Sequence, residues 1–279
     1  MIIDSHTHIF HEKIKQDRSP YFENEPEFKL LYNSPKAKIS LAEDLIQSMD
    51  RHKVNLSVVC GFPWRSPDLI KQNNDVVIEA VRTYPGRIKG LACFDVAWDG
   101  AAHETQRCID AGLSGAGELA FYLSGIDKKA LSFLDPVMAV LRENNTLPCM
   151  IHTNEPVGHP YPGKTPITLE QIYTLAETFP DNRIILAHWG GGILFYNIMK
   201  KQTQTILKNI WYDTAASPFL FDSQIYDMAA IAGVIEKVLF GTDFPLLAPD
   251  RYYKDLDNSR ITARQRAMVL GENAGPLFG

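Results

Sequence analysis

Met1-Ile-Ile-Asp-Ser-His-Thr-His-Ile9 opens the chain and holds its most informative pattern. The apolar start predicts a short, buried β-strand that carries Asp4, His6 and His8. Alternate residues of a strand share a face, so the two histidine side chains point the same way, as two ligands of one metal ion must. The pair indicates a metal only if other candidate ligands join it, which makes the rest of the chain decisive.

Seven further apolar or β-branched runs follow, each separated from the next by a longer stretch with helical periodicity. The alternation favours an α/β fold, a closed parallel (β/α)₈ TIM barrel, over an open doubly wound sheet. The length of 279 residues and the hydrophobic content of 45% suit one such barrel, and no linker or repeat divides residues 1–279, so a single domain is expected. The eight candidate strands are 2–8, 56–61, 88–94, 113–118, 148–153, 183–188, 210–214 and 238–243.

Local signals predict where several helices begin. Three segments predict capping boxes, in which a hydroxyl and a side chain three residues later satisfy opposing backbone donors. Two cap residues followed by proline predict helices with proline at the first position. The long irregular segment 11–39 predicts a lid or binding loop. The capping segments are Ser40-Leu-Ala-Glu43, Thr168-Leu-Glu-Gln171 and Thr262-Ala-Arg-Gln265, and the proline starts are Ser66-Pro67 and Asp135-Pro136.

Composition excludes several classes of function. The net charge of −5 comes without a basic cluster, so a nucleic-acid or membrane-surface partner is not expected, and a small-molecule substrate is. The four cysteines are far apart and form no CxxC, which argues against a structural zinc knuckle or a disulfide framework. No leader or long apolar segment is apparent, so a cytoplasmic location is the default expectation, and a homodimer is the general prior.

Polar residues at strand ends locate the predicted site, because the active site of a (β/α)₈ barrel forms at the C-terminal ends of its strands. Glu118, His152, His188 and Asp243 end the fourth, fifth, sixth and eighth candidate strands. A single histidine at a strand end is more often a core or capping residue. Because all the candidate ligands fall at the same mouth of one predicted barrel, metal binding becomes the better interpretation. Imidazoles with carboxylates suit Zn²⁺, with manganese, iron or nickel as alternatives. A metal lowers the pKa of bound water, and Asp243 would take its proton.

These motifs together resemble the amidohydrolase superfamily, and most closely its amidohydrolase-related branch, which includes the aminocarboxymuconate-semialdehyde decarboxylase-like enzymes. The resemblance covers essentially the whole chain and implies that His6, His8, His152 and Asp243 hold one ion, while His188 binds a second ion or acts as acid/base. Glu118 departs from many mononuclear relatives, and by the resemblance would bridge two ions, so one or two ions are expected. The motifs are Asp4–His8, His152, His188, Gly241-Thr242-Asp243-Phe244-Pro245 and Gly271-Glu272-Asn273-Ala274.

The loops at the predicted mouth offer candidate substrate-binding residues. The segment 152–164 is either a substrate-binding loop or a proline-stiffened surface loop. After the second strand, Trp64 would line one side of the pocket, and Arg65 would bind a substrate carboxylate bidentately. The alternative is that Trp64 only covers the barrel rim. The three glycines 190–192 favour a tight turn over a phosphate site, beside Trp189 as a lining residue. The candidates in the loop are Glu155, His159, Tyr161 and Lys164.

The leading hypothesis is a metal-dependent hydrolase that cleaves a small amide, ester or lactone with Asp243 as proton shuttle. The alternative is a metal-dependent lyase, a decarboxylase or hydratase acting on an aromatic or dienoic acid. A third interpretation is a metal-binding protein without turnover.

Overall fold

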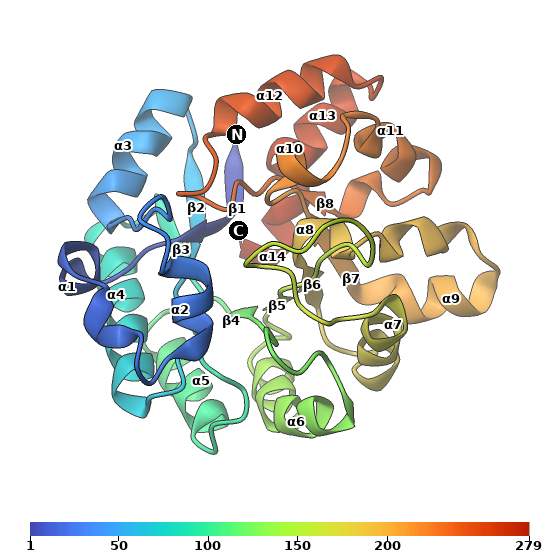
Figure 1. Ribbon diagram of the computed structural model, residues 1–279. Coiled ribbons are helices and arrows are strands. Elements are labelled where there is room, and N and C mark those ends of the chain that lie inside the picture. The colour runs from blue at the N-terminus through green and yellow to red at the C-terminus, as the bar shows by residue number, and fades with distance from the viewer. Residues whose placement is uncertain (279) are drawn as a thin grey trace.

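Eight parallel strands form the centre of the molecule, and helices surround them on the outside (Figure 1). The computed structural model describes residues 1–278. Each strand lies within its predicted range, except that β4 ends one residue later, at Leu119, and every strand is shorter than predicted. The apolar runs are largely buried on both faces, which is why they mark the strand positions. The strands are β1 (Ile3–His8), β2 (Leu56–Cys60), β3 (Ile88–Gly90), β4 (Ala116–Leu119), β5 (Cys149–Ile151), β6 (Ile184–Leu186), β7 (Ile210–Asp213) and β8 (Val238–Leu239).

The strands close into a barrel in sequence order. Regular pairing gives two arcs, β1-β2-β3 and β4-β5-β6-β7-β8. Backbone bonds from Ala92 N to Gly115 O (2.9 Å) and from Gly117 N to Ala92 O (2.8 Å) join β3 to β4. At the other seam, Ser5 N donates to Phe240 O at 2.7 Å and His8 N to Phe244 O at 2.7 Å. The predicted TIM barrel is therefore confirmed, and the first and last strands lie side by side.

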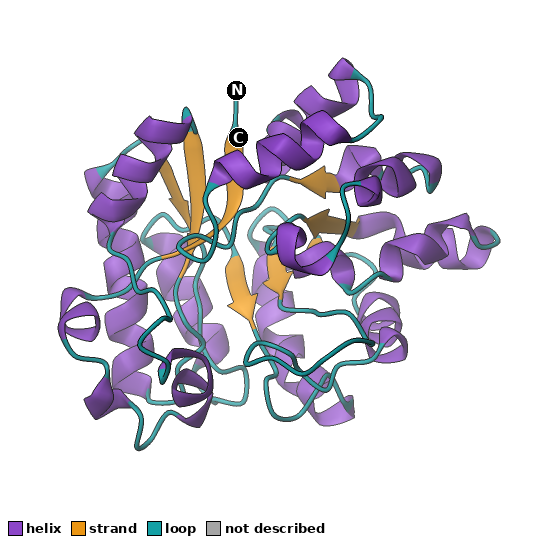
Figure 2. Ribbon diagram, turned by 45° about the horizontal axis from the view of Figure 1, so that its top comes forward, coloured by secondary structure: helices purple, strands orange, loops and turns teal. Residues whose placement is uncertain are grey.

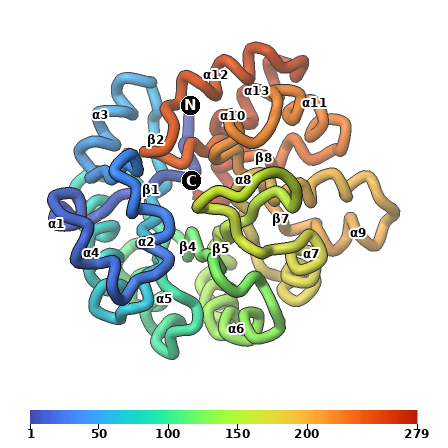
Figure 3. The backbone as a smooth tube through the Cα atoms, in the orientation of Figure 1, coloured from blue at the N-terminus to red at the C-terminus, as the bar shows by residue number. Residues whose placement is uncertain are grey.

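The outer helices alternate with the strands around the barrel (Figures 2 and 3). Within residues 1–278, no helix combines the length and the apolar character needed to cross a membrane. The main helices are α1 (Glu12–Gln16), α2 (Pro26–Tyr32), α3 (Ala42–His52), α4 (Pro67–Thr83), α5 (Ala101–Asp110), α6 (Lys128–Glu143), α7 (Leu169–Thr178), α8 (Ala187–Gly190), α9 (Lys201–Ile206), α10 (Ser217–Leu220), α11 (Gln224–Ile231), α12 (Pro249–Asn258), α13 (Ala263–Leu270) and α14 (Gly275–Phe278).

Two predicted helix starts are wrong, and three are confirmed. α7 and α13 begin with the predicted capping boxes, and α4 begins at Pro67. α6 begins at Lys128, because the Asp127 side chain accepts from Ala130 N and the apolar face then continues across Pro136. Ser40 does not cap α3: the cap is Leu41, whose N–H donates to Asp44 at 2.8 Å.

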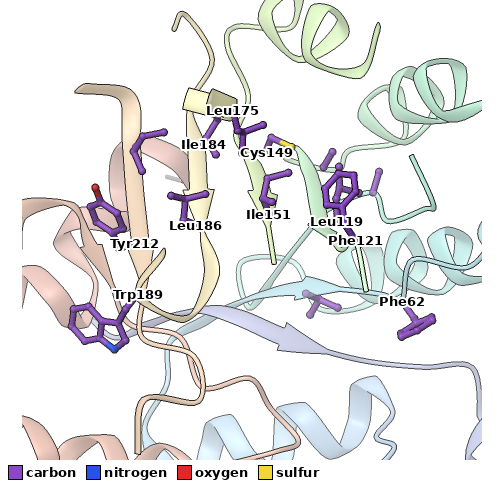
Figure 4. Packing of buried hydrophobic residues seen from close by; sticks show 14 of the residues in the cluster. Phe62, Leu119, Phe121, Cys149, Ile151, Leu175, Ile184, Leu186, Trp189 and Tyr212 are labelled. Atoms are coloured by element: carbon purple, nitrogen blue, oxygen red, sulfur yellow. The ribbon is translucent and has the colours of Figure 1, made fainter. Parts of the chain in front are cut away.

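The core has two layers, separated by the barrel wall. Outward-facing strand residues such as Ile151, Ile184 and Leu186 pack against the helices (Figure 4). Inward-facing residues, among them Val58, Met150 and Ile185, fill the barrel interior and contact α14. These apolar residues fill the barrel below its C-terminal mouth, where the site described next lies.

Candidate metal centre

Six acidic and histidine side chains meet at the C-terminal mouth of the barrel, in two groups of three. β1 contributes the histidines of its strand end, β4 contributes a glutamate, and the residues after β5, β6 and β8 complete the set. All six are ligands expected from the sequence, but His152 lies with Glu118 and His188 and not, as expected, with His6, His8 and Asp243. Their ligand atoms lie within 4.8 Å of one another inside each group, which is His6, His8 and Asp243, or Glu118, His152 and His188.

Glu118 lies between the two groups and presents one carboxylate oxygen to each. Its Oε1 is 2.9 Å from His152 Nδ1 and 3.5 Å from His188 Nε2. Its Oε2 is 3.6 Å from His6 Nε2 and 3.7 Å from His8 Nε2. The side chain is only 6% exposed, so both oxygens are directed into the cluster. This is the arrangement that a carboxylate shared by two ions requires.

Each of the four histidines directs one ring nitrogen into the cluster and donates the other N–H to a protein oxygen. His6 Nδ1 donates to Asp213 Oδ2 at 2.8 Å, and His8 Nδ1 donates to Gly61 O at 2.9 Å. His188 Nδ1 donates to Ala215 O at 2.9 Å, and His152 Nε2 to Gly163 O at 2.9 Å. Such bonds fix the tautomer of a metal-binding histidine and leave the inward nitrogen free to ligate.

The inward atoms are also spaced as ligands are. His6 Nε2 and His8 Nε2 are 3.0 Å apart, and Asp243 Oδ1 is 3.4 Å from His8 Nε2 and 3.9 Å from His6 Nε2. Ligand atoms roughly 2.1 Å from a tetrahedral ion lie about 3.4 Å from one another. The residues present therefore fit a divalent ion, both in donor chemistry and in spacing.

The backbone near the centre adopts uncommon conformations that bring these side chains inward. His188 and Asp243 have φ values of 56° and 57°, in the left-handed region. Non-glycine residues there are uncommon and cluster at functional sites. At Gly191, also at φ +60°, a Cβ would lie 2.3 Å from Asn154 O, so only glycine lets the loop after β6 pass this close to the loop after β5. This is a tight turn, as expected for the three glycines.

Asp4 aligns the first and last strands beside the cluster. Its carboxylate accepts from Thr242 N at 2.9 Å and from Thr242 Oγ1 at 2.6 Å, while Asp243 N donates to His6 O at 2.9 Å. Burial nevertheless raises the pKa of Asp4 to about 7. Asp4 thus fixes the position of Asp243 relative to the histidines of β1.

The carboxylates and histidines of the cluster shift each other's pKa values strongly. Burial acts to raise the pKa of Asp243, but the His8 hydrogen bond and the charges of His6 and His188 lower it to about 2. Burial acts to lower the pKa of His188, but the hydrogen bond and charge of Glu118 raise it to about 9. The pKa of Glu118 lies well below its ordinary value because its nearest partners are histidines. Without a bound ion, protonated histidines pair with the carboxylates of this cluster.

We therefore expect the metal-free protein to lose stability as the pH rises from 6.5 to about 9. The folded-state pKa of His188 is raised to about 9 from 6.5, so its pairing with Glu118 contributes fully below 6.5 and is lost as the pH passes through the folded value. Thermal unfolding of chelator-treated protein at pH 6 and pH 9 measures this. A midpoint at pH 9 equal to that at pH 6 would contradict the prediction, and His188→Gln should flatten the dependence.

Asp213, at the end of β7, is a site residue that the sequence interpretation missed. It is fully buried, and besides its bond to His6 its Oδ1 accepts from His188 N at 2.9 Å and Ala215 N at 3.0 Å. It therefore orients ligands from both groups. The same rule that selected the other strand ends could have found it, because it is the next-to-last residue of the seventh candidate strand, as His152 is of the fifth.

Replacing Asp213 by asparagine should weaken metal binding about 10- to 100-fold, because the neutral amide orients His6 less strongly than the carboxylate does. The two backbone donors keep an oxygen acceptor in this variant, so the fold should survive. Competition for Mn²⁺ against a chelating dye gives the dissociation constants. An affinity within about twofold of wild type would contradict a role for Asp213 in ligand orientation.

The residues expected to bind substrate after β2 and β6 are engaged elsewhere. Trp64 is fully buried, donates to Asn73 Oδ1 at 3.2 Å and packs on Phe28. The side chain of Arg65 is 45% exposed and pairs with Glu27. Trp189 is also fully buried, with its indole N–H donating to Ser217 Oγ at 2.9 Å. The structure does not bring these three groups into contact with the cluster.

The loop after β5 is held by bonds among its own residues. Glu155 accepts from Tyr161 OH at 2.8 Å and from Lys164 Nζ at 2.9 Å, and Asn154 Oδ1 accepts from Thr165 N at 2.8 Å. His159 is exposed and lies beside Tyr161. The contact of Gly163 O with His152 brings the loop to the edge of the centre. The loop's charged groups thus stabilise its shape.

Comparison with known proteins identifies relatives along the whole chain. A family model described as amidohydrolase matches residues 3–279, in agreement with the resemblance carried by the motifs. No curated protein matches the sequence. The 5-carboxyvanillate decarboxylase of Sphingomonas paucimobilis is 17% identical, with a TM-score of 0.74 over 99% of this chain and 98% of that chain.

Two further solved structures contain manganese. The dihydroxybenzoic acid decarboxylase of Polaromonas sp. JS666, with bound manganese and the inhibitor 2-nitroresorcinol, is 18% identical, with a TM-score of 0.70 over 99% of this chain and 96% of that chain. The 5-carboxyvanillate decarboxylase of Novosphingobium aromaticivorans, complexed with manganese and 4-hydroxy-3-methoxy-5-nitrobenzoic acid, is 15% identical, with a TM-score of 0.74 over 100% and 96%.

These comparisons correct the leading functional prediction. All three solved structures are decarboxylases, which are lyases, so the hydrolase prediction is wrong, and the alternative that the sequence left open agrees with them. A divalent metal is supported both by the two ligand groups and by the manganese in related structures.

Proposed function

Because the chain belongs to the amidohydrolase family, whose model matches residues 3–279, we propose that it is a metal-dependent decarboxylase of a small aromatic acid. The observation that carries the proposal is the cluster of four histidines and two carboxylates, each histidine oriented by a protein acceptor. The decarboxylases with similar folds supply the reaction class.

His6, His8 and Asp243 would hold one ion, and Glu118, His152 and His188 a second, with Glu118 shared. When bound, a divalent ion supplies a Lewis acid that holds substrate oxygens and withdraws charge from them. Manganese is the first metal to test because it occupies related structures, and zinc, the metal expected from the sequence, is the second.

Asp243 is the residue best placed to handle the proton. Its side chain is 20% exposed, more than any other of the six ligands, so a substrate at the mouth reaches it first. Decarboxylation breaks the bond between the ring carbon and the carboxylate carbon, leaves the electron pair on the ring carbon, and requires a proton there. The Asp243 carboxylate can take a proton from solvent water and pass it to the ring carbon, while the carboxylate carbon leaves as carbon dioxide.

Release of carbon dioxide from candidate acids tests the proposal. The protein, purified without chelator or affinity tag and then loaded with Mn²⁺ or Zn²⁺, would be assayed with 5-carboxyvanillate and the dihydroxybenzoate isomers. Turnover should disappear in His6→Ala and remain in His103→Ala, a matched change at an exposed histidine of α5. Absence of carbon dioxide from every acid with either metal would contradict the proposed function.

A further inference from the structure

Two tyrosines from different parts of the chain lie beside the metal centre. The ring of Tyr122, just after β4, lies 5.2 Å from the ring of His152. Tyr122 is nearly parallel to Phe62, at 6.2 Å and 8°, and Tyr32 meets the other edge of this group, 5.9 Å from Phe62. Phe62 thus joins the two tyrosines in one aromatic wall next to the second ligand group.

Tyr32 is positioned by the segment that the sequence marked as a lid or binding loop. It ends α2, stacks on Phe28 at 4.8 Å and lies beside Phe10 at 5.2 Å. Arg18 holds the following turn by donating to Tyr32 O at 3.3 Å and Ala37 O at 2.7 Å. Lys38 donates to Leu246 O at 3.1 Å, so the segment spans from the loop after β2 to the loop after β8.

The hydroxyl groups of Tyr32 and Tyr122 have no hydrogen-bond partner among residues 1–278. Tyr122 is 8% exposed and Tyr32 is half-buried, and neither hydroxyl is among the fully buried polar atoms that lack a partner. By contrast, Tyr252 OH donates to Thr242 O at 2.8 Å, and Tyr212 OH accepts from Asn197 at 2.9 Å. The hydroxyl groups of Tyr32 and Tyr122 thus reach the solvent at the edge of the metal centre and are free to bind a substrate.

Both hydroxyl groups are neutral donors at neutral pH, because the ordinary pKa of a tyrosine is about 10. Arg65 and Lys164 are the two cations that the sequence suggested for substrate binding. Arg65 pairs with Glu27, and Lys164 pairs with Glu155. Neutral phenols are then the donors available to a substrate anion, and they cost less to desolvate than a charged group would.

We propose that Tyr32 and Tyr122 form a recognition subsite beside the metal centre, where their hydroxyl groups donate hydrogen bonds to an anionic oxygen of the substrate. The flat aromatic wall of Phe62 suits the ring that carries this oxygen. The subsite selects aromatic anions with an oxygen acceptor that reaches this wall. The inference rests on the proposed function for the identity of the substrate as an aromatic acid.

Binding of 2-hydroxybenzoate to the Mn²⁺-loaded protein tests the subsite without requiring turnover. Isothermal titration should give dissociation constants about fivefold to tenfold weaker for Tyr122→Phe and for Tyr32→Phe, the loss typical of one hydrogen bond. Phenylalanine keeps the ring and its packing, so the Mn²⁺ dissociation constant should stay at its wild-type value in both variants. Tyr84→Phe, at the end of α4 and the far end of the barrel, is the matched control and should bind the probe as wild type does.

The outcomes separate this inference from the proposed function. Equal affinity of wild type and both variants would overturn the subsite, and so would absence of 2-hydroxybenzoate binding to the loaded wild type. Weakened binding in the variants, without carbon dioxide release from any acid, would support the subsite and contradict decarboxylation. Carbon dioxide release with unchanged affinities would support decarboxylation and overturn the subsite.

Discussion

Replacing Asp243 by asparagine should reduce turnover roughly 100- to 10,000-fold, the range typical of losing a positioned proton-transfer group. The amide cannot accept and return the proton, whereas the carboxylate can. The fold should persist, since asparagine tolerates the φ of 57° at this residue better than most side chains. The decarboxylation rate of the loaded protein measures the effect.

Metal content must be measured on the same Asp243→Asn sample, because this residue is also a proposed ligand. A lost rate with retained metal assigns the loss to proton transfer, and a joint loss assigns it to ligation. Asp181→Asn, at an exposed position before β6, is the matched control and should leave the rate unchanged. Activity above about a tenth of wild type in Asp243→Asn would contradict the proton-transfer role.

Replacing Glu118 by glutamine should lower the metal content from about two equivalents per chain to about one, as expected when a bridging carboxylate is lost. Glutamine keeps one oxygen, but its amide nitrogen cannot ligate. In wild type, one carboxylate oxygen faces His152 and His188, and the other faces His6 and His8. Glutamine can therefore offer a ligand oxygen to only one of the two groups. Plasma mass spectrometry on protein purified without chelator or tag measures the stoichiometry.

The control is Glu177→Gln, which removes an exposed carboxylate at the end of α7 and should leave the metal content unchanged. About one equivalent in wild type, unchanged in Glu118→Gln and lost in His6→Ala, would contradict the two-ion arrangement and favour a single ion. The shared carboxylate would then serve only to orient the histidines around it.

The barrel and its ligand groups could be predicted from sequence because both depend on strand ends. Buried parallel strands read as apolar runs, and their C-terminal ends converge, so a polar residue at each end is placed without knowledge of any loop. Asp213 follows the same rule because it ends β7, but the sequence interpretation did not include it among the ligands or their partners.

Residues in loops and at helix ends could not be placed in this way. Arg65 follows β2 as expected, but its ion pair with Glu27 depends on how the segment before α3 folds back. Tyr32 and Tyr122 lie far apart in sequence, and both contact Phe62. No periodic sequence pattern predicts these contacts. The start of α6 was misjudged because Pro136 is tolerated inside a helix whose apolar face is already packed. The ion pair and the aromatic contacts depend on tertiary packing, which local sequence does not encode, whereas the Asp127 cap of α6 is a local signal.

The seam between β8 and β1 has a consequence for biosynthesis. The proposed ligands His6 and His8 are translated long before Asp243 and the Thr242 partner of Asp4. A nascent chain on the ribosome therefore carries a histidine pair that lacks its carboxylate until the final strand emerges. The complete ligand set therefore exists only after the segment that follows β8 has emerged, and a chain stalled before β8 would lack Asp243.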